Sequence, residues 1–125
     1  MSTYTIILDL TRPLMTSNEQ RRAHWTKVRD TKWATELSVC NVLRRRGDVA
    51  VTAPVDVHLT WYVPDARRRD SDSLGPCLKA CLDALVKAGV IPDDSSEYVR
   101  RSGSSVVVDR ADPRIELVIV ELEAA

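Results

Sequence analysis

The chain has 125 residues, of which 44% are hydrophobic and 29% charged, values typical of one globular domain. This composition excludes a disordered or collagen-like chain, and the length suffices to bury a core. Basic and acidic side chains number 18 each, so the formal net charge is zero, which excludes nucleic-acid binding through bulk positive charge. The charge is nevertheless uneven, because residues 1–50 hold 9 basic and 5 acidic side chains and residues 51–125 hold 9 and 13.

The cysteines and the N-terminal sequence indicate the compartment. Cys40, Cys77 and Cys81, with His24 and His58 far apart, match neither a disulfide framework nor a zinc-ligand spacing. We expect the cysteines to be small, partly buried hydrophobic residues in a reducing cytosol. The first ten residues lack the features of a signal peptide, and no apolar stretch approaches the ~20 residues that span a bilayer. We therefore expect a soluble, intracellular protein without a membrane partner.

The N-terminal half is predicted to form a strand and then a long helix. β-Branched residues dominate Thr3–Leu10, as is typical of a strand. Ser17 with Gln20 resembles a capping box, and Gly47 after three arginines marks a helix end. The segment Glu19–Trp25 fits an irregular loop equally well. The residues at helical spacing that should face the core are Trp33, Leu37, Cys40 and Leu43.

The second half is predicted to add three strands and a helix. Strict alternation of apolar and polar residues over Val55–Val63 predicts a half-buried strand. A helix is expected over Leu74–Ala88, and two further strands over Glu97–Asp109 and Arg114–Glu123. The helix residues expected to face inward are Leu74, Leu78, Cys81, Leu82 and Leu85. The order β-α-β-α-β-β predicts a single domain, residues 1–125, of the α+β (mixed α/β) class, with about four strands of mixed sheet packed against two main helices.

Acidic residues gather in the two loops that flank the second predicted helix. Asp70 and Asp72 precede it, and Asp93 and Asp94 follow it. Residues two apart in an extended segment point the same way, so Asp70 and Asp72 can share one ligand. A helix of about 15 residues is roughly 22 Å long, so the two pairs meet only if the chain after Gly89 doubles back. Crowded carboxylates favour a hard cation such as Mg²⁺ or Mn²⁺, although a solvated acidic loop fits the same residues.

Basic residues accompany these acids. Three consecutive arginines directly precede Asp70, and guanidinium groups pair with phosphate in a bidentate manner. Lys79 and Asp83 share one helix face with Asp72 if Asp72 is helical, and they fit the wet face of an amphipathic helix equally well. From the residues alone, a phosphate-and-metal site and a solvated charged surface both stay open.

The run VPDARRRDSDSL followed by LKACLDALVKAGVIPDDSS resembles the RusA family of Holliday-junction resolvases, which is frequent in phages and prophages. The resemblance is close over residues 61–97 and looser over the rest, including Ser17-Asn18 before the first helix. Two features depart from the family pattern. Ser73 stands where the family usually has Asn, and Gly75-Pro76-Cys77 looks like an insertion that moves Lys79 by about 4.5 Å along the helix.

The resemblance implies a Mg²⁺-dependent endodeoxyribonuclease, with Mn²⁺ as the alternative metal. Such an enzyme resolves four-way DNA junctions by paired symmetric nicks that leave 5′-phosphates, in DNA recombination and repair. The resemblance assigns metal binding and catalysis to Asp70, Asp72 and Asp94, catalysis to Lys79, and a mainly structural role to Asp83. The partners it implies are branched DNA and a second copy of the chain, without an organic cofactor, in a bacterial or phage-infected cytosol. The expected DNA-binding residues are Arg67, Arg68, Arg69, Arg21, Arg22, Lys27 and Arg29.

Two other classes of protein fit the same residues. One is a branched-DNA-binding module without catalytic activity, which Ser73 and the insertion suggest. The other is a metal-dependent phosphohydrolase or transferase acting on a small nucleotide, because Asp-x-Asp beside arginines can hold a nucleoside diphosphate.

Overall fold

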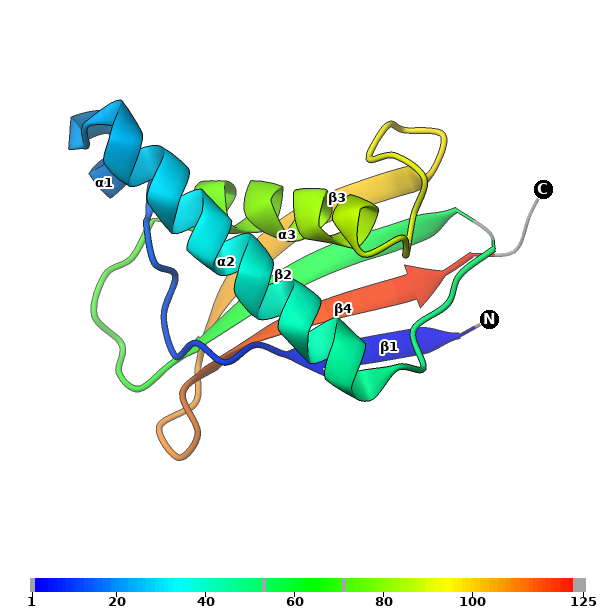
Figure 1. The fold of residues 1–125 in the computed structure, drawn as a ribbon. Helices are drawn as coiled ribbons and strands as arrows, with labels where there is room; N and C mark the ends of the chain where they lie inside the picture. Colours follow the sequence, from blue (N-terminus) through cyan, green and yellow to red (C-terminus); the bar gives the residue numbers. More distant parts are fainter. Residues whose placement is uncertain (1, 53, 71, 123–125) are drawn as a thin grey trace.

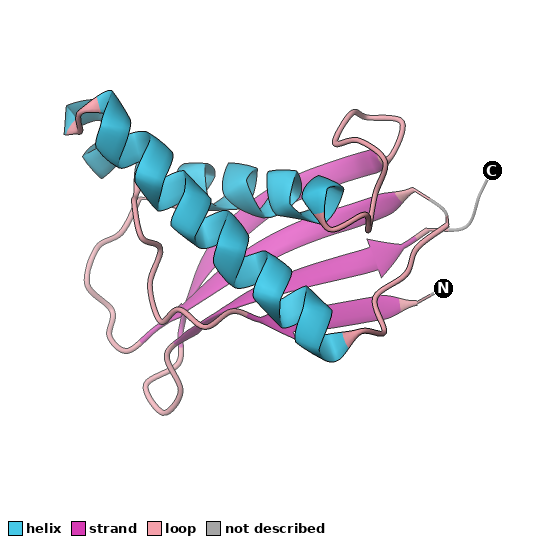
Figure 2. Cartoon of the chain, in the orientation of Figure 1, coloured by secondary structure: helices cyan, strands magenta, loops and turns pink. Residues whose placement is uncertain are grey.

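A four-stranded sheet carries the helices on one of its faces (Figures 1 and 2). The computed structural model describes residues 2–52, 54–70 and 72–122. Its elements are β1 (Thr3–Ile7), α1 (Ser17–Arg22), α2 (Trp25–Arg46), β2 (Val55–Val63), α3 (Gly75–Lys87), β3 (Val99–Val108) and β4 (Arg114–Glu121). The predicted α+β class and order of elements are confirmed, with the first predicted helix divided in two.

The sheet has the strand order β1-β4-β2-β3 and is mixed. β4 pairs antiparallel with both β1 and β2, whereas β2 and β3 run parallel. A parallel pair needs a crossover, and α3 supplies it between β2 and β3. The loop from Val63 to Gly75 therefore joins the end of β2 to the start of α3. This loop carries the acidic and arginine-rich motif.

The core lies between the helices and one face of the sheet. β2 alternates as predicted, with Leu59 at 0% and Trp61 at 8% exposure. From α3, Ala84 and Leu85 join this core, as does Leu74 just before the helix. Leu78 and Leu82 are only partly buried. The thiols of Cys77 and Cys81 are buried and that of Cys40 is half-buried, all three free, as expected of small hydrophobic residues.

The capping box of the first helix differs from the prediction by one residue. Thr16, in an extended conformation, is the N-cap of α1, and its partner is Glu19 rather than Gln20. The backbone N–H of Glu19 donates to Thr16 Oγ1 at 3.3 Å, and Thr16 N–H donates to Glu19 Oε1 at 3.0 Å. The chain then turns at Ala23, and His24 caps α2 by accepting from the N–H of Thr26 at 3.2 Å. Residues 19–25 are thus helical up to Arg22 and extended at the junction.

The face of α2 that packs inward was predicted correctly only in part: Leu43 is in the core and Cys40 packs against it. Trp33 and Leu37 are 67% and 62% exposed. The buried residues of this helix are Thr35, Glu36, Val39, Val42 and Leu43. Two of these are polar and have partners: Thr35 Oγ1 donates to the carbonyl of Thr31 at 2.9 Å, and Glu36 pairs with lysines. Satisfied polar groups can be buried at little cost, so the apolar spacing alone was wrong at Trp33 and Leu37.

The remaining boundaries shift by a few residues. β1 ends at Ile7, and β3 continues through Gly103 because its ladder to β2 is unbroken there. Pro76 lies in the first turn of α3, where a missing N–H is tolerated. The predicted strand end at Glu123 lies outside the described residues. Within those residues, no helix is both long and apolar enough to cross a membrane.

Candidate active site

The loop that carries Asp70 and Asp72 is fastened to α1 by Ser17. Ser17 Oγ donates to the carbonyl of Asp72 at 2.6 Å, and its backbone N–H donates to the carbonyl of Ser73 at 3.2 Å. At Gly75 a Cβ atom would lie 3.2 Å from Ser17 Oγ, so glycine permits this close approach. α1 is thereby placed against the motif, although the two segments are more than fifty residues apart in sequence.

α1 also supplies the partners of both acids of the motif. Asn18 Nδ2 donates to Asp70 Oδ2 at 3.1 Å, and Arg21 Nη2 lies 3.6 Å from Asp72 Oδ2. Arg21 Nη1 also donates to Asn18 Oδ1 at 2.6 Å, which joins the two contacts. Sequence reasoning missed these roles of Asn18 and Arg21. The only signal for Asn18 was the resemblance around Ser17-Asn18.

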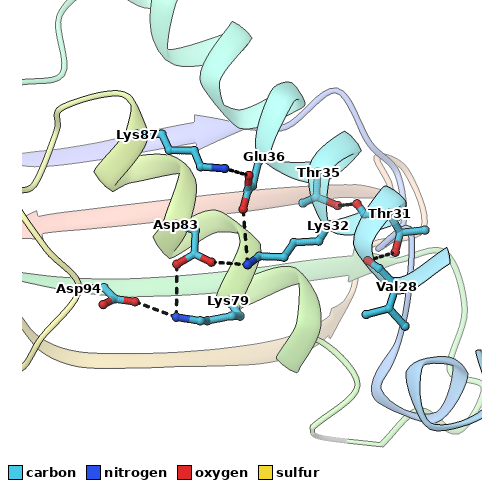
Figure 3. Close-up of polar contacts among 9 residues, drawn as sticks. All are labelled: Val28, Thr31, Lys32, Thr35, Glu36, Lys79, Asp83, Lys87 and Asp94. Atoms are coloured by element: carbon cyan, nitrogen blue, oxygen red, sulfur yellow. Dashed lines mark hydrogen bonds and ion pairs between the residues drawn. The ribbon is translucent and has the colours of Figure 1, made fainter. Parts of the chain in front are cut away.

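Asp94 is brought back alongside α3, as its predicted site requires. Gly89 adopts a left-handed conformation with φ 77°, and the N–H of Val90 then donates to the carbonyl of Leu85 at 2.9 Å. The reversed chain places Asp94 Oδ2 3.0 Å from Lys79 Nζ (Figure 3). Asp94 therefore reaches the second turn of α3 and not only its far end.

Lys79 and Asp83 share one face of α3, with Nζ and Oδ1 3.2 Å apart. Asp72 lies in the turn before this helix and contacts Arg21, so it does not extend that face. The hydrogen bonds of Lys79 to Asp94 and to Asp83 raise the pKa of its ammonium group. Lys79 therefore stays positively charged throughout the neutral range.

A chain of alternating charges continues from Asp83 to α2 (Figure 3). Lys32 Nζ lies 2.8 Å from Asp83 Oδ2 and 3.8 Å from Glu36 Oε1, and Lys87 pairs with the other oxygen of Glu36. Burial would raise the pKa of Asp83, but the hydrogen bonds from Lys32 and Lys79 outweigh burial and lower it. Asp83 is thus an ionised, largely buried carboxylate between two lysines.

The three consecutive arginines have different surroundings. Arg69 is 12% exposed, donates to the carbonyl and carboxylate of Asp65 at 3.1 Å, and lies 5.2 Å from the ring centre of Trp61. Arg68 is 92% exposed and lies 4.0 Å from Asp70. Arg67 is 79% exposed and contacts Asp65 at 3.3 Å. Arg67 and Arg68 are accessible to a phosphate, whereas Arg69 holds the loop.

The other predicted DNA-binding residues lie on α1 and the first turns of α2, at the same end of the molecule as the motif (Figure 1). Arg22 and Lys27 are exposed. Arg29 lies 5.2 Å from the ring centre of Trp25 and pairs with Asp30 at 3.2 Å. These side chains extend the basic surface from the loop onto α1 and α2.

The predicted metal ligands fit a hard divalent cation by their chemistry, because all are carboxylates. In addition, Ser73 Oγ is buried beside the motif and has no hydrogen-bond partner among the described residues. Over residues 2–52, 54–70 and 72–122, no three His, Cys, Asp or Glu side chains are placed to hold a metal ion. Asp94 is held by Lys79, and Asp70 and Asp72 by α1.

Fold and site together define a small α+β protein in which acidic and arginine side chains meet where β2 leads into α3. The chain is 32% identical to crossover junction endodeoxyribonuclease RusA of Escherichia coli strain K12, over 98% of both chains. It is 37% identical over 75 residues to the proteins of that name from Shigella sonnei and Enterobacteria phage 82, or 60% of this chain and 58% of each relative. No protein-family model matches the chain. The protein belongs to the RusA family, which confirms the resemblance found in the sequence.

Proposed function

We propose that this protein is a Mg²⁺-dependent, structure-selective endodeoxyribonuclease that resolves four-way DNA junctions by paired symmetric nicks, in the cytosol of a bacterium or an infected host. The observation that carries this proposal is the full-length similarity to crossover junction endodeoxyribonuclease RusA. The site supports it, since Asp70 and Asp72 offer carboxylates to a cation beside two exposed arginines that suit phosphate.

In this proposal Asp70, Asp72 and Asp94 hold the metal ion. When bound, Mg²⁺ supplies activation of a water molecule and stabilisation of charge on the scissile phosphate. Asn18 orients the carboxylate of Asp70 through its 3.1 Å hydrogen bond, and Arg21 lies 3.6 Å from Asp72 as an exposed ion pair. Asp70 thus has a fixed partner before DNA arrives, and the three carboxylates would be drawn together on binding of the metal.

The basic side chains act on the DNA backbone. Lys79 carries its positive charge beside Asp94, where it would neutralise charge that develops on phosphate oxygens. Arg67 and Arg68 would bind flanking phosphates, which position the DNA without reading its sequence. These contacts make the affinity for DNA dependent on salt concentration.

A second copy of the chain would complete a two-fold arrangement suited to a symmetric junction. We propose that the copies meet along α2, at a shallow groove beside the exposed Trp33 and Leu37. Asp30 precedes Leu37 by seven residues and Arg44 follows it by seven, and both are exposed. A two-fold axis at Leu37 would place Asp30 of each copy near Arg44 of the other, so the face is self-complementary in charge.

The test is cleavage of a labelled four-way junction and a matched duplex with Mg²⁺, Mn²⁺ or EDTA. We expect paired nicks in the junction only, and none in EDTA. Asp72→Asn should abolish cleavage and leave junction binding unchanged or tighter, because the lost carboxylate repels phosphate. Asp48→Asn is the matched control, since Asp48 is an exposed acid that pairs with Arg46 away from the site.

The alternatives give different results. Tight junction binding without nicks in any metal would identify a binding module without activity. Turnover of nucleotides without tight DNA binding would identify a nucleotide phosphohydrolase. Loss of binding together with cleavage in Asp72→Asn would contradict the assignment of Asp72 as a metal ligand.

A further inference from the structure

Lys79 is a flexible side chain whose position depends on its partners. Its side chain is 60% exposed and contacts two carboxylates, Asp94 at 3.0 Å and Asp83 at 3.2 Å. An unanchored lysine would sample many rotamers and lose effectiveness toward a phosphate held at one position. Asp83 is the more fixed of the two anchors because it belongs to the same helix as Lys79, whereas Asp94 lies in the loop that follows.

Asp83 in turn depends on Lys32. Lys79 and Asp83 both belong to α3, whereas Lys32 reaches Asp83 from α2, at 2.8 Å. Lys32 and Lys79 also line one cleft of about 360 Å³ between α1, α2 and α3. The side chain of Lys32 therefore lies at the border of the proposed active site without contacting its acids.

Lys32 and Lys79 are both positively charged and share one carboxylate, Asp83. With Lys32 present, the negative charge of Asp83 is shared between two ammonium groups. Without it, Lys79 would be the only cation left on Asp83 in this network and would be drawn toward it, away from Asp94. The attraction of Asp83 for Lys79 would then no longer be shared with a second cation.

We infer that Lys32 is a positioning residue for the nuclease site. Its ammonium group offsets part of the negative charge of Asp83, and Lys79 thereby stays extended toward Asp94 and the scissile phosphate. The inference rests on the proposed function. It is carried by the contacts of Figure 3, in which Lys32 is the only side chain of α2 joined to Asp83.

The first experiment measures single-turnover cleavage of a four-way junction with the protein in saturating excess. Lys32→Met should lower the cleavage rate roughly tenfold, while the Kd for the junction in EDTA changes by less than about twofold. Lys32→Arg should restore most of the rate, because it keeps the positive charge beside Asp83. In an Asp83→Asn background, Lys32→Met should have little further effect, since the charge it neutralises is gone.

Lys87→Met is the matched control. Lys87 belongs to the same network but contacts Glu36 rather than Asp83. We expect this variant to lose clearly less of the cleavage rate than Lys32→Met, because Lys87 acts on Asp83 only through Glu36 and Lys32. An equal loss in both lysine variants would mean that the network only stabilises the fold, and the inference would be wrong.

A second readout does not depend on cleavage. In metal-free protein with isotopically labelled lysine, the NMR signal of the Lys79 ε-methylene group should move further in Lys32→Met than in Lys87→Met. An unmoved signal in Lys32→Met would overturn the inference. So would weaker junction binding with an unchanged cleavage rate, because Lys32 would then be a simple phosphate contact. If the parent protein cleaved no junction, the proposed function would fall, and the NMR signal would still decide the role of Lys32 toward Lys79.

Discussion

Consecutive residues of one type can serve different purposes, as the arginines before Asp70 do. Arg69 donates to Asp65 at the base of the loop and stacks near Trp61, whereas Arg68 extends into solvent. A run of arginines in a sequence carries no information about which side chain turns inward. The prediction that all three bind DNA is therefore refined to Arg67 and Arg68, and Arg69 acts on the shape of the loop.

This difference predicts that substitution of Arg69 changes the stability of the protein, whereas substitution of Arg68 changes its binding to DNA. Arg69→Met should destabilise the protein by about 2 kcal/mol, because it removes charge-assisted hydrogen bonds and a cation–π contact. Arg68→Met should leave the free energy of unfolding unchanged and reduce the slope of log Kd for a junction against log salt by about one. Urea unfolding and salt-dependent binding titrations measure the two effects. A stable Arg69→Met protein with a reduced salt slope would return Arg69 to the DNA-binding set.

At the scale of elements, α1 is held in place by polar contacts. It buries none of its side chains, and Ser17 makes two of the hydrogen bonds that attach it to the motif, beside the contacts of Asn18 and Arg21. Its docking therefore depends on groups that are far apart in sequence. The helix itself was predictable from its cap, but its position over Asp70 and Asp72 was not.

Ser17→Ala should loosen the docking of α1 on the motif, because it removes the hydrogen bond from Ser17 Oγ to the carbonyl of Asp72. We expect a local loss of about 1 kcal/mol from the missing hydrogen bond, with faster amide exchange in α1 and slower junction cleavage. Ser38→Ala, on α2, is the control, because Ser38 Oγ is buried and has no partner among the described residues. Unchanged exchange in α1 of the Ser17→Ala protein would show that the helix is held by other contacts.

The elements also show where sequence patterns succeed. The alternation over Val55–Val63 predicted β2 correctly, because the pleat of a strand maps directly onto its two faces. The prediction for α2 was wrong at Trp33 and Leu37, because Glu36 is buried instead with a partner, Lys87, that lies on another helix. The contact of Lys32 could not be predicted for the same reason, because its partner Asp83 is on another helix. The proposed acids of the site rest on the family resemblance, whereas their contacts required the fold.

At the scale of the whole molecule, two exposed surfaces are candidates for the interface of the proposed dimer: the exposed face of α2 and the sheet face opposite the helices. The first carries Trp33 and Leu37 between opposite charges. The second, away from the helices, mixes exposed apolar residues such as Ile7 and Val107 with polar ones, and His58 is hydrogen-bonded to Ser105 across β2 and β3. The mixture of apolar centre and complementary ends favours α2 as the interface.

Leu37→Glu should therefore convert a dimer into a monomer, measured by sedimentation equilibrium. Val107→Glu is the matched control on the sheet face, where Val107 is 42% exposed. Asp30→Arg should weaken the dimer by placing like charges together, and Arg44→Asp in the same chain should restore it. A dimer that withstood Leu37→Glu and dissociated in Val107→Glu would move the interface to the sheet.

Because α1 is docked by polar contacts, the free energy needed to detach it differs from the free energy needed to unfold the core. The sheet and α3 are held by a continuous apolar core, whereas detaching α1 costs only a few hydrogen bonds. A partly open form, with the core intact and Asp70 and Asp72 without Asn18 and Arg21, thus lies below global unfolding in free energy. Warming should inactivate the protein well before it melts, and DNA that bridges α1 and the loop should reverse that loss by binding only the closed form. The working temperature range of such an enzyme is set by its substrate as much as by its core.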